Sequence, residues 1–198
     1  MTCPSHCVGA VVLAAGRSSR MGANKLIQDL HGRPVIAHVL DAIAAAGLPP
    51  PLVVLGHDRD AVLEGIGKRA IRAVDAPDFA DGMGRSIAAG FAAAPQDWAA
   101  ALLCLGDMPL LSPALLAQMA SRASPSGIVI PVHGGRRGHP VCWGRAYFPE
   151  LALLQGDVGA RHILGLHRAR ISEIAADAGV HLDVDTFDAL DALRNDVP

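Results

Sequence analysis

Short, uninterrupted apolar runs alternate along this chain with stretches of helical periodicity. Runs of a few apolar residues without polar interruption are typical of β-strands that are covered on both faces. These runs span residues 8–13, 52–55, 71–74, 101–105 and 128–132. The spacing of hydrophobic residues predicts helices between and after them, at residues 34–47, 60–66, 85–94, 113–122, 159–167 and 187–194.

This alternation predicts an α/β fold with a mainly parallel sheet and right-handed crossovers. We expect a Rossmann-like three-layer sandwich, because helices that follow each strand cover both faces of such a sheet. The 198 residues fit one domain, 1–198, with residues 1–7 as a loose leader. Ligands of such sheets bind beyond the carboxyl ends of the strands. The loops after 8–13 and 101–105 are therefore expected to share one edge and form the site.

Composition narrows the class of ligand. Hydrophobic residues make up 51% of the chain and aromatic residues only 4%, a balance that suits aliphatic helices packed on a sheet. The net charge of −2, without a run of Lys and Arg, gives no reason to expect a nucleic-acid partner. No apolar run approaches the roughly 18 residues of a membrane helix. We therefore expect a cytoplasmic protein with no membrane contact, a small-molecule ligand and four reduced cysteines.

The loop after the first strand has the sequence LAAGRSSRMGANK, which is small, glycine-containing and basic. Small residues let the backbone approach a ligand and direct its N–H groups at phosphate oxygens. The residues expected to do so are Leu13, Ala14, Ala15 and Gly16. Arg20 and Lys25 add positive charge, so the loop predicts a triphosphate cradle. It lacks the Gly-Lys-Ser/Thr of a Walker loop and the internal glycine of a dinucleotide fingerprint.

Candidate metal ligands follow another strand. Asp107 comes directly after the apolar run 101–105, where its carboxylate reaches the expected crevice. Mg²⁺ prefers oxygen ligands, commonly one or two carboxylates with phosphate and water. If residues 182–186 are extended, Asp183 and Asp185 share a face, and one or both can approach Asp107. The alternative is that Asp185 or Thr186 caps the last helix.

A second glycine-containing segment precedes the helix expected at 85–94. Gly82, Met83 and Ser86 lie there and are our candidates for contact with a nucleoside base, with Gly56 as a further candidate. The alternative is an ordinary loop followed by a helix N-cap, without contact to a ligand.

The pattern Leu-Ala-Ala-Gly-x-Ser-x-Arg-Met-Gly-x-x-Lys resembles the signature of the nucleotidyltransferases that move a nucleoside monophosphate from a triphosphate onto a phosphate acceptor. The resemblance implies catalytic roles for Arg20, Lys25 and Asp107. It also implies that Asp185, just before a threonine, helps to hold Mg²⁺, and that the segment from Gly82 lies against the base. The alternative is a strand-to-helix turn whose glycines only make the bend.

Three further segments narrow this resemblance: LGDMPLL at 105–111, RRGHPV at 136–141 and GDVGAR at 156–161. Together they resemble the MocA-like molybdenum cofactor cytidylyltransferases of the MobA-like NTP transferase family. The resemblance implies the nucleotide-diphospho-sugar transferase type of fold. It also implies that CTP and molybdopterin-bound molybdenum yield the cytosine dinucleotide cofactor and pyrophosphate. Arg137 and His139 become candidates for binding the acceptor, and a molybdenum hydroxylase becomes a possible transient partner.

Ala15 favours CTP, because related guanylyltransferases usually carry glycine there. One methyl group discriminates by only about 1–3 kcal/mol, so GTP stays open. An enzyme that uses a different phosphate acceptor, such as a sugar phosphate, stays open as well. So does a noncatalytic carrier of the molybdenum cofactor, although a carrier has no need of a triphosphate site.

Overall fold

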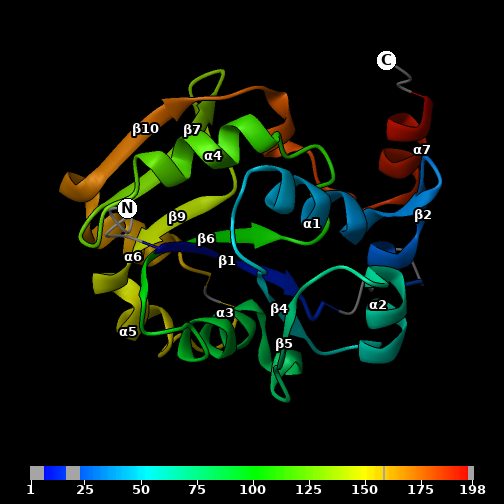
Figure 1. Cartoon of the computed structure of the whole chain (residues 1–198), viewed down its shortest axis with the longest axis horizontal. Helices are drawn as coiled ribbons and strands as arrows, with labels where there is room; N and C mark the ends of the chain where they lie inside the picture. Colours follow the sequence, from blue (N-terminus) through cyan, green and yellow to red (C-terminus); the bar gives the residue numbers. More distant parts are fainter. Residues whose placement is uncertain (1–6, 17–22, 158, 196–198) are drawn as a thin grey trace, which may run out of the picture.

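The computed structural model describes residues 7–16, 23–157 and 159–195. These residues form a central sheet with the strand order β10-β7-β9-β6-β1-β4-β5, with β8 paired to β7 (Figure 1). The strands are β1 (Cys7–Ala14), β4 (Leu52–Leu55), β5 (Arg72–Asp75), β6 (Trp98–Leu105), β7 (Ile128–His133), β8 (Arg136–Arg137), β9 (Val141–Gly144) and β10 (Ile171–Ala175). The five apolar runs therefore form strands, to within a few residues at their ends.

Strand pairing confirms the mainly parallel sheet. β1 pairs in parallel with β4 and β6, β4 with β5, and β7 with β10. β9 lies antiparallel between β6 and β7, and the two-residue β8 pairs antiparallel with β7. The four residues of β9 are all buried. Because β9 returns from β7 through the segment around β8, residues 136–140 come back toward the sheet immediately before it.

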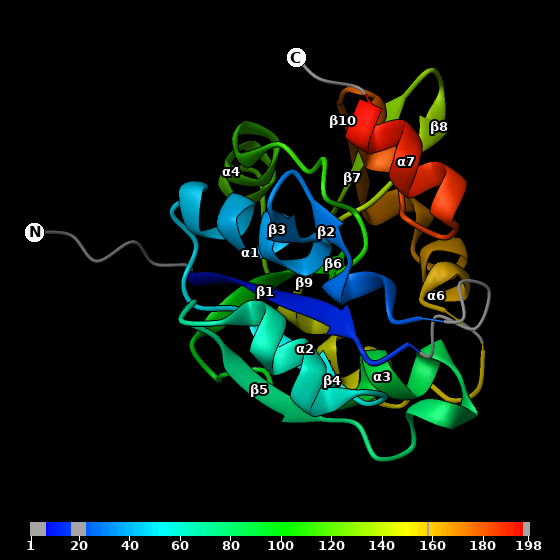
Figure 2. The same ribbon diagram turned by 90° about the vertical axis from the view of Figure 1, so that its right-hand side faces the viewer.

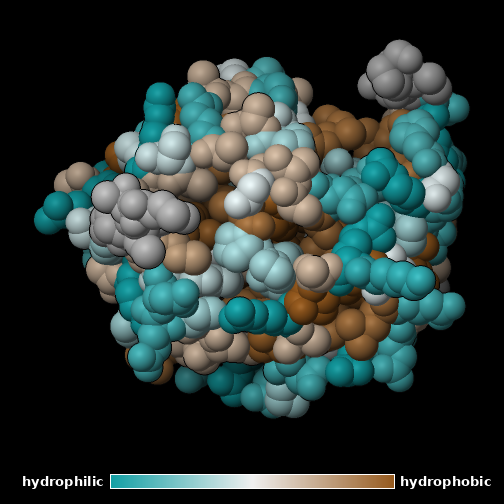
Figure 3. Space-filling view, viewed as in Figure 1, coloured by the Kyte–Doolittle hydropathy of each residue, from teal (hydrophilic) through white to brown (hydrophobic). Residues whose placement is uncertain are grey.

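Helices cover both faces of the sheet, as the predicted sandwich requires. One face carries α1 (Val35–Ala45), α2 (Arg59–Ile66) and α4 (Pro113–Ser121). The other carries α3 (Met83–Ala92), α5 (Phe148–Leu151) and α6 (Arg161–Leu166). Figure 1 shows α1 and α4 on one side of β1, and α3 and α5 on the other. The outer margin of the molecule in this view is mostly hydrophilic (Figure 3).

β1 shows how the sequence builds this layering. Ala10 and Val12 are buried in the core beneath α1 and α4, whereas Val11 is buried in the core beneath α3. Successive side chains of a strand point to opposite faces of the sheet. A strand covered on both faces therefore has apolar residues at consecutive positions, which explains the uninterrupted run.

Several boundaries differ from the sequence prediction. Cys7, expected in the loose leader, instead begins β1, because it pairs with Trp98 at the start of β6. Pro34, expected to open a helix, is extended with ψ 143° and pairs with Asp29, so α1 begins one residue later. The sequence pattern predicts neither β10 nor α5. Within the part of the chain that the structure describes, no helix is long and apolar enough to cross a membrane.

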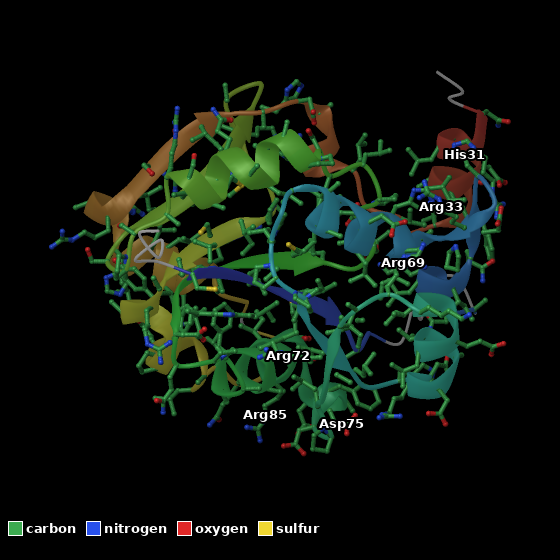
Figure 4. The ribbon with its side chains drawn as sticks, viewed as in Figure 1. His31, Arg33, Arg69, Arg72, Asp75 and Arg85 are labelled. Atoms are coloured by element: carbon green, nitrogen blue, oxygen red, sulfur yellow. The ribbon has the colours of Figure 1, made fainter. Side chains whose placement is uncertain are left out.

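A small hairpin lies apart from the main sheet and holds the last helix, α7 (Phe187–Asn195). Its strands are β2 (Asp29–Leu30) and β3 (Arg33–Pro34). Figure 2 shows α7 beside this hairpin. The guanidinium of Arg194 donates to the Asp29 carbonyl, and His31 contacts the Leu193 carbonyl at 3.1 Å. Figure 4 labels His31 and Arg33 at this junction.

Candidate active site

The loop after β1 begins at the expected edge of the sheet. The Leu13 carbonyl accepts a hydrogen bond from Gly106 N at 3.0 Å, which joins the ends of β1 and β6. A Cβ on Gly106 would lie 2.8 Å from that carbonyl oxygen, so only glycine permits this close approach. The Ala15 carbonyl accepts from His57 N at 3.3 Å. A Cβ on Gly16 would meet no atom of the described residues within 4 Å.

Lys25 is the first residue of a short 3-10 helix, η1 (Lys25–Ile27). The buried Asn24 caps this turn through its side-chain oxygen, which accepts from Leu26 N at 3.1 Å. The ammonium of Lys25 lies 2.5 Å from Asp107 Oδ2 and 2.6 Å from Asp185 Oδ1. The candidate residue Arg20 lies outside the described residues.

Three carboxylates meet at this point. One oxygen each from Asp107, Asp183 and Asp185 lies within 4.8 Å of the others. Val184 N donates to the Asp107 carbonyl at 2.9 Å, and the Val184 side chain is fully buried. Its two neighbours along the chain therefore project to the opposite side, toward Asp107. The predicted shared face is confirmed, although this segment forms no strand.

The capping alternative is also realised, by the neighbouring threonine. Thr186 Oγ1 accepts from Ala189 N at 3.1 Å in the first turn of α7. Asp185 is therefore not needed as the cap, and its carboxylate faces Lys25 instead.

Charge is concentrated at this cluster. Burial by itself lowers the pKa of Lys25, but the adjacent carboxylates of Asp107 and Asp185 outweigh it, so the pKa lies above its ordinary value. Burial raises the pKa of the Asp183 carboxyl, and repulsion from Asp185 and Asp107 raises it further. Such a cluster favours a cation.

The donor set fits a hard divalent cation. Mg²⁺ and Mn²⁺ take carboxylate oxygens, and the Lys25 ammonium already stands between two of these carboxylates as a positive charge. Asp107 Oδ1 is buried and has no hydrogen-bond partner among the described residues. A cation held by Asp107 and Asp185 would face the end of β1.

The base-side candidates lie at the start of α3. Gly82 has φ +117°, and a Cβ there would overlap the carbonyl carbon of Gly156. Gly84 N donates to the Gly156 carbonyl at 2.9 Å, which holds the loop containing Gly156 against the helix. Ser86 is buried in the first turn of α3, while Met83 is 50% exposed.

These elements enclose one pocket of about 510 Å³. The predicted residues that line it are Leu13, Ala14, Ala15, Gly16, Lys25, Gly82, Met83, Ser86, Asp107 and Asp185. Asp183, which the sequence analysis named with Asp185, also lines it, and the further lining residues are Leu26, Phe79, Ala80, Leu105 and Asp157. Phe79 and Ala80 belong to η2 (Phe79–Asp81), the short helix directly before Gly82. The aromatic residue three positions before Gly82 is the sequence feature that could have identified this part of the lining.

Of the predicted residues that the structure describes, three are not on this lining. A Cβ on Gly56 would lie 2.8 Å from Ala15 Cβ, so Gly56 packs behind the loop. Arg137 is exposed on β8 and donates to Glu173 Oε1 of β10 at 2.7 Å.

His139 donates its backbone N–H to the Val180 carbonyl and precedes a cis proline. Burial lowers the pKa of His139, although the charge of Asp107 opposes that shift.

A family model described as the MobA-like NTP transferase domain matches residues 10–172. Among curated proteins, the bifunctional protein GlmU of Heliobacterium modesticaldum is 33% identical over 138 residues, which is 69% of this chain and 30% of that protein. GlmU of Clavibacter sepedonicus is 30% identical over 194 residues, 96% of this chain and 38% of that protein. The chain thus spans well under half the length of these curated relatives.

Solved structures match over nearly the whole chain. Rv0371c from Mycobacterium tuberculosis H37Rv has a TM-score of 0.85 at 29% identity, covering 96% of this chain and 98% of that one. A nucleotidyl transferase from Methanothermobacter thermautotroptrophicus has a TM-score of 0.84 at 26% identity, covering 96% of each chain. A further structure of Rv0371c is a complex with manganese.

Proposed function

The chain belongs to the MobA-like NTP transferase family, and we propose on this premise that it transfers CMP from CTP to the phosphate of molybdopterin-bound molybdenum cofactor, with Mg²⁺ as the cofactor. The observation that carries the proposal is the meeting of the glycine loop, Lys25 and the carboxylates of Asp107 and Asp185 in one pocket. The products are molybdopterin cytosine dinucleotide and pyrophosphate.

The reaction asks little of a general base. An oxygen of the acceptor phosphate attacks the α-phosphorus of CTP, and the bond to the β-phosphate breaks to release pyrophosphate. A phosphate monoester is largely ionised at neutral pH, so no side chain has to remove its proton. The protein's work is to align two anions that repel each other and to stabilise the charge of the leaving group.

The residues divide this work by position. The segment from Leu13 to Gly16 lines the pocket, and the loop that follows β1 is proposed to direct N–H groups at the triphosphate, with Lys25 as a positive charge beside it. Arg20, which follows in the same loop, is proposed to add a second. Bound Mg²⁺ supplies further charge neutralisation, and Asp107 and Asp185 are the residues that would hold it.

The nucleoside is proposed to lie against the start of α3. Gly82, Met83 and Ser86 border the pocket there, and Ala15 borders it from the β1 loop. Ala15 is only 3% exposed, and its Cβ lies next to Gly56 behind the loop. The proposal of CTP over GTP therefore rests on the family resemblance.

The acceptor is proposed to approach from the side of residues 136–139, where Arg137 and His139 offer a positive charge and hydrogen-bonding groups. His139 is close enough to the cluster for the charge of Asp107 to influence its pKa. Transfer of the product to a molybdenum hydroxylase would follow in a transient complex.

A second candidate is the same transfer to another acceptor, such as a sugar phosphate. Two observations favour keeping it: the GlmU relatives, and the position of Arg137 and His139 away from the described lining of the pocket. The triphosphate side of the site serves either acceptor equally well.

The deciding experiment measures pyrophosphate release from CTP and from GTP with Mg²⁺, in the presence of molybdenum-loaded molybdopterin, of a sugar phosphate, or of no acceptor. We expect release from CTP only with molybdenum-loaded molybdopterin. Release with GTP would assign the protein to guanylyl transfer, and release with a sugar phosphate would establish the second candidate. Cofactor binding without release from either nucleotide would indicate a noncatalytic carrier.

A further inference from the structure

We propose that the Lys25 ammonium holds the metal position while the triphosphate is absent, so that the protein takes up its divalent cation together with the nucleotide rather than alone. This inference rests on the proposed function. It adds an order of binding, which the identity of the reaction does not specify.

The geometry of the ammonium is the starting observation. Lys25 Nζ lies 2.5 Å from Asp107 Oδ2 and 2.6 Å from Asp185 Oδ1, the two residues proposed to hold the metal. The side chains of Lys25 and Asp107 are each only 15% exposed. A cation bridging these same two carboxylates would overlap or closely face the ammonium, and two positive charges that close repel each other strongly.

The carboxylates cannot easily move aside to avoid this conflict. Asp107 is held at the end of β6, where the preceding residue, Gly106, bonds to the Leu13 carbonyl. Val184, between the other two aspartates, is fully buried and bonds to the Asp107 carbonyl. Its core contacts include Leu30 of the hairpin and Leu190 of α7. The backbone that carries the acidic groups is therefore anchored on both sides.

The backbone of Lys25 is anchored as well. Asn24 is buried and caps η1, and its carbonyl accepts from Gln28 Nε2 at 3.2 Å. The adjustable part is the four-carbon stem of Lys25, which lets the ammonium change its position by rotation. Lys25 and Gly16 line the same pocket, and a Cβ on Gly16 would contact none of the residues that the structure describes. A triphosphate bound there would offer the ammonium new oxygen partners.

The exchange of partners explains the expected order. A divalent cation that enters alone must displace the ammonium from two carboxylates without offering it another anion. When the nucleotide enters too, Lys25 exchanges carboxylate oxygens for phosphate oxygens, and the cation receives both carboxylates and phosphate. The charge of Lys25 therefore opposes binding of the metal alone and favours binding of the metal–nucleotide complex.

The test is a titration of the nucleotide-free protein with Mn²⁺ alone, followed by electron paramagnetic resonance of the free ion. It compares the native protein with Lys25→Met, which removes the charge but keeps the length of the side chain. Lys68→Met is the matched control, because Lys68 is the chain's other lysine and is exposed. Lys25→Arg keeps the charge, and thermal unfolding checks that each variant is folded.

We expect Lys25→Met to bind Mn²⁺ about tenfold or more tightly than the native protein, because an adjacent positive charge is removed. Lys68→Met and Lys25→Arg should keep the weak affinity of the native protein. Equal affinity of Lys25→Met and native protein, or equal tightening in Lys25→Arg, would overturn the inference.

A second titration, with an α,β-methylene analogue of CTP present, separates this inference from the proposed function. We expect the analogue to tighten Mn²⁺ binding much more in the native protein than in Lys25→Met, after correction for binding by the nucleotide itself. Equal tightening in both overturns the inference while pyrophosphate release still supports the transferase. Absence of Mn²⁺ binding in every case would overturn the metal assignment itself.

Discussion

The triphosphate side of the pocket and the proposed acceptor segment are held in different ways. On the first side, Lys25 and Asp107 are each 15% exposed and pair with each other across the ends of separate elements. On the second, Arg137 is 47% exposed and pairs with Glu173 at the rim of the sheet. Charges removed from solvent interact strongly, whereas solvent screens exposed pairs. Substitutions should therefore be much more costly on the first side.

The largest expected effect tests the buried side directly. Asp107→Asn should lower turnover by roughly 10³-fold, because stabilisation by a bound cation contributes several kcal/mol to such a transfer. The measurement is the rate of pyrophosphate release from CTP at saturating acceptor. Asp60→Asn is the control, because the Asp60 side chain is 96% exposed on α2. Normal turnover of Asp107→Asn at ordinary Mg²⁺ would remove Asp107 from the metal site.

A smaller effect is expected on the acceptor side. His139→Ala and Arg137→Ala should each raise the acceptor KM by roughly 10- to 100-fold, because a hydrogen bond to a charged group contributes about 1.5–3 kcal/mol, and leave the KM for CTP nearly unchanged. Steady-state kinetics with the acceptor varied measures this. The neighbouring Arg136→Ala is the control. If neither variant changes the acceptor KM, the acceptor binds elsewhere, and Arg137 and His139 do not belong to the site.

Nucleotide choice should respond more weakly. Ala15→Gly should shift the ratio of kcat/KM for CTP and GTP toward GTP by about fivefold, which corresponds to about 1 kcal/mol, the lower end of the range of about 1–3 kcal/mol for one methyl group in a pocket. Competition between the two nucleotides measures the ratio. An unchanged ratio would mean that the segment at Gly82 and Ser86, rather than Ala15, distinguishes the bases.

The smallest expected effect is on stability. Burial holds the pKa of His139 below its ordinary value, with Arg161 and His181 acting in the same direction and Asp107 against it. As the pH falls below about 6.5, the unfolded chain takes up this proton before the folded one does, so the free energy of unfolding decreases. Urea unfolding at pH 7.5 and 5.5 measures the decrease. It should be smaller in His139→Gln, while His162→Gln, at an exposed site, should behave as the native protein. An identical decrease in His139→Gln would contradict the assignment.

Much of the buried side was predictable because its signals are local. The run before Asp107 and the glycine loop after Leu13 each predicted a strand end, and the parallel arrangement brings such ends to one edge. The sequence also predicted that Asp183 and Asp185 share a face, because alternation in an extended segment is a local property. The family resemblance added the roles of Lys25 and Asp107, which stay proposals.

Other features depended on partners far along the chain. β10 has only two of its five residues facing inward enough to be partly or fully buried, so its pattern resembled a loop. β9 is antiparallel to its neighbours because the chain returns between β6 and β7 to form it. Nothing in the four residues of β9 specifies that direction. The family resemblance implies that Arg137 binds the acceptor. In the structure, Arg137 forms an ion pair with Glu173. This ion pair depends on the pairing of β7 with both β8 and β10, which the local sequence does not specify.

The sequence by itself determined most of the segments that form strands and helices, which face of a strand each side chain takes, and where the glycine loop and acidic segments occur. Only the tertiary structure decided that Lys25 meets Asp107 and Asp185, the latter 160 residues away along the chain. Local periodicity depends on neighbouring residues, whereas the choice of partner depends on how α7, the hairpin and β6 pack around Val184. That packing brings the acidic groups to the lysine and so completes the site.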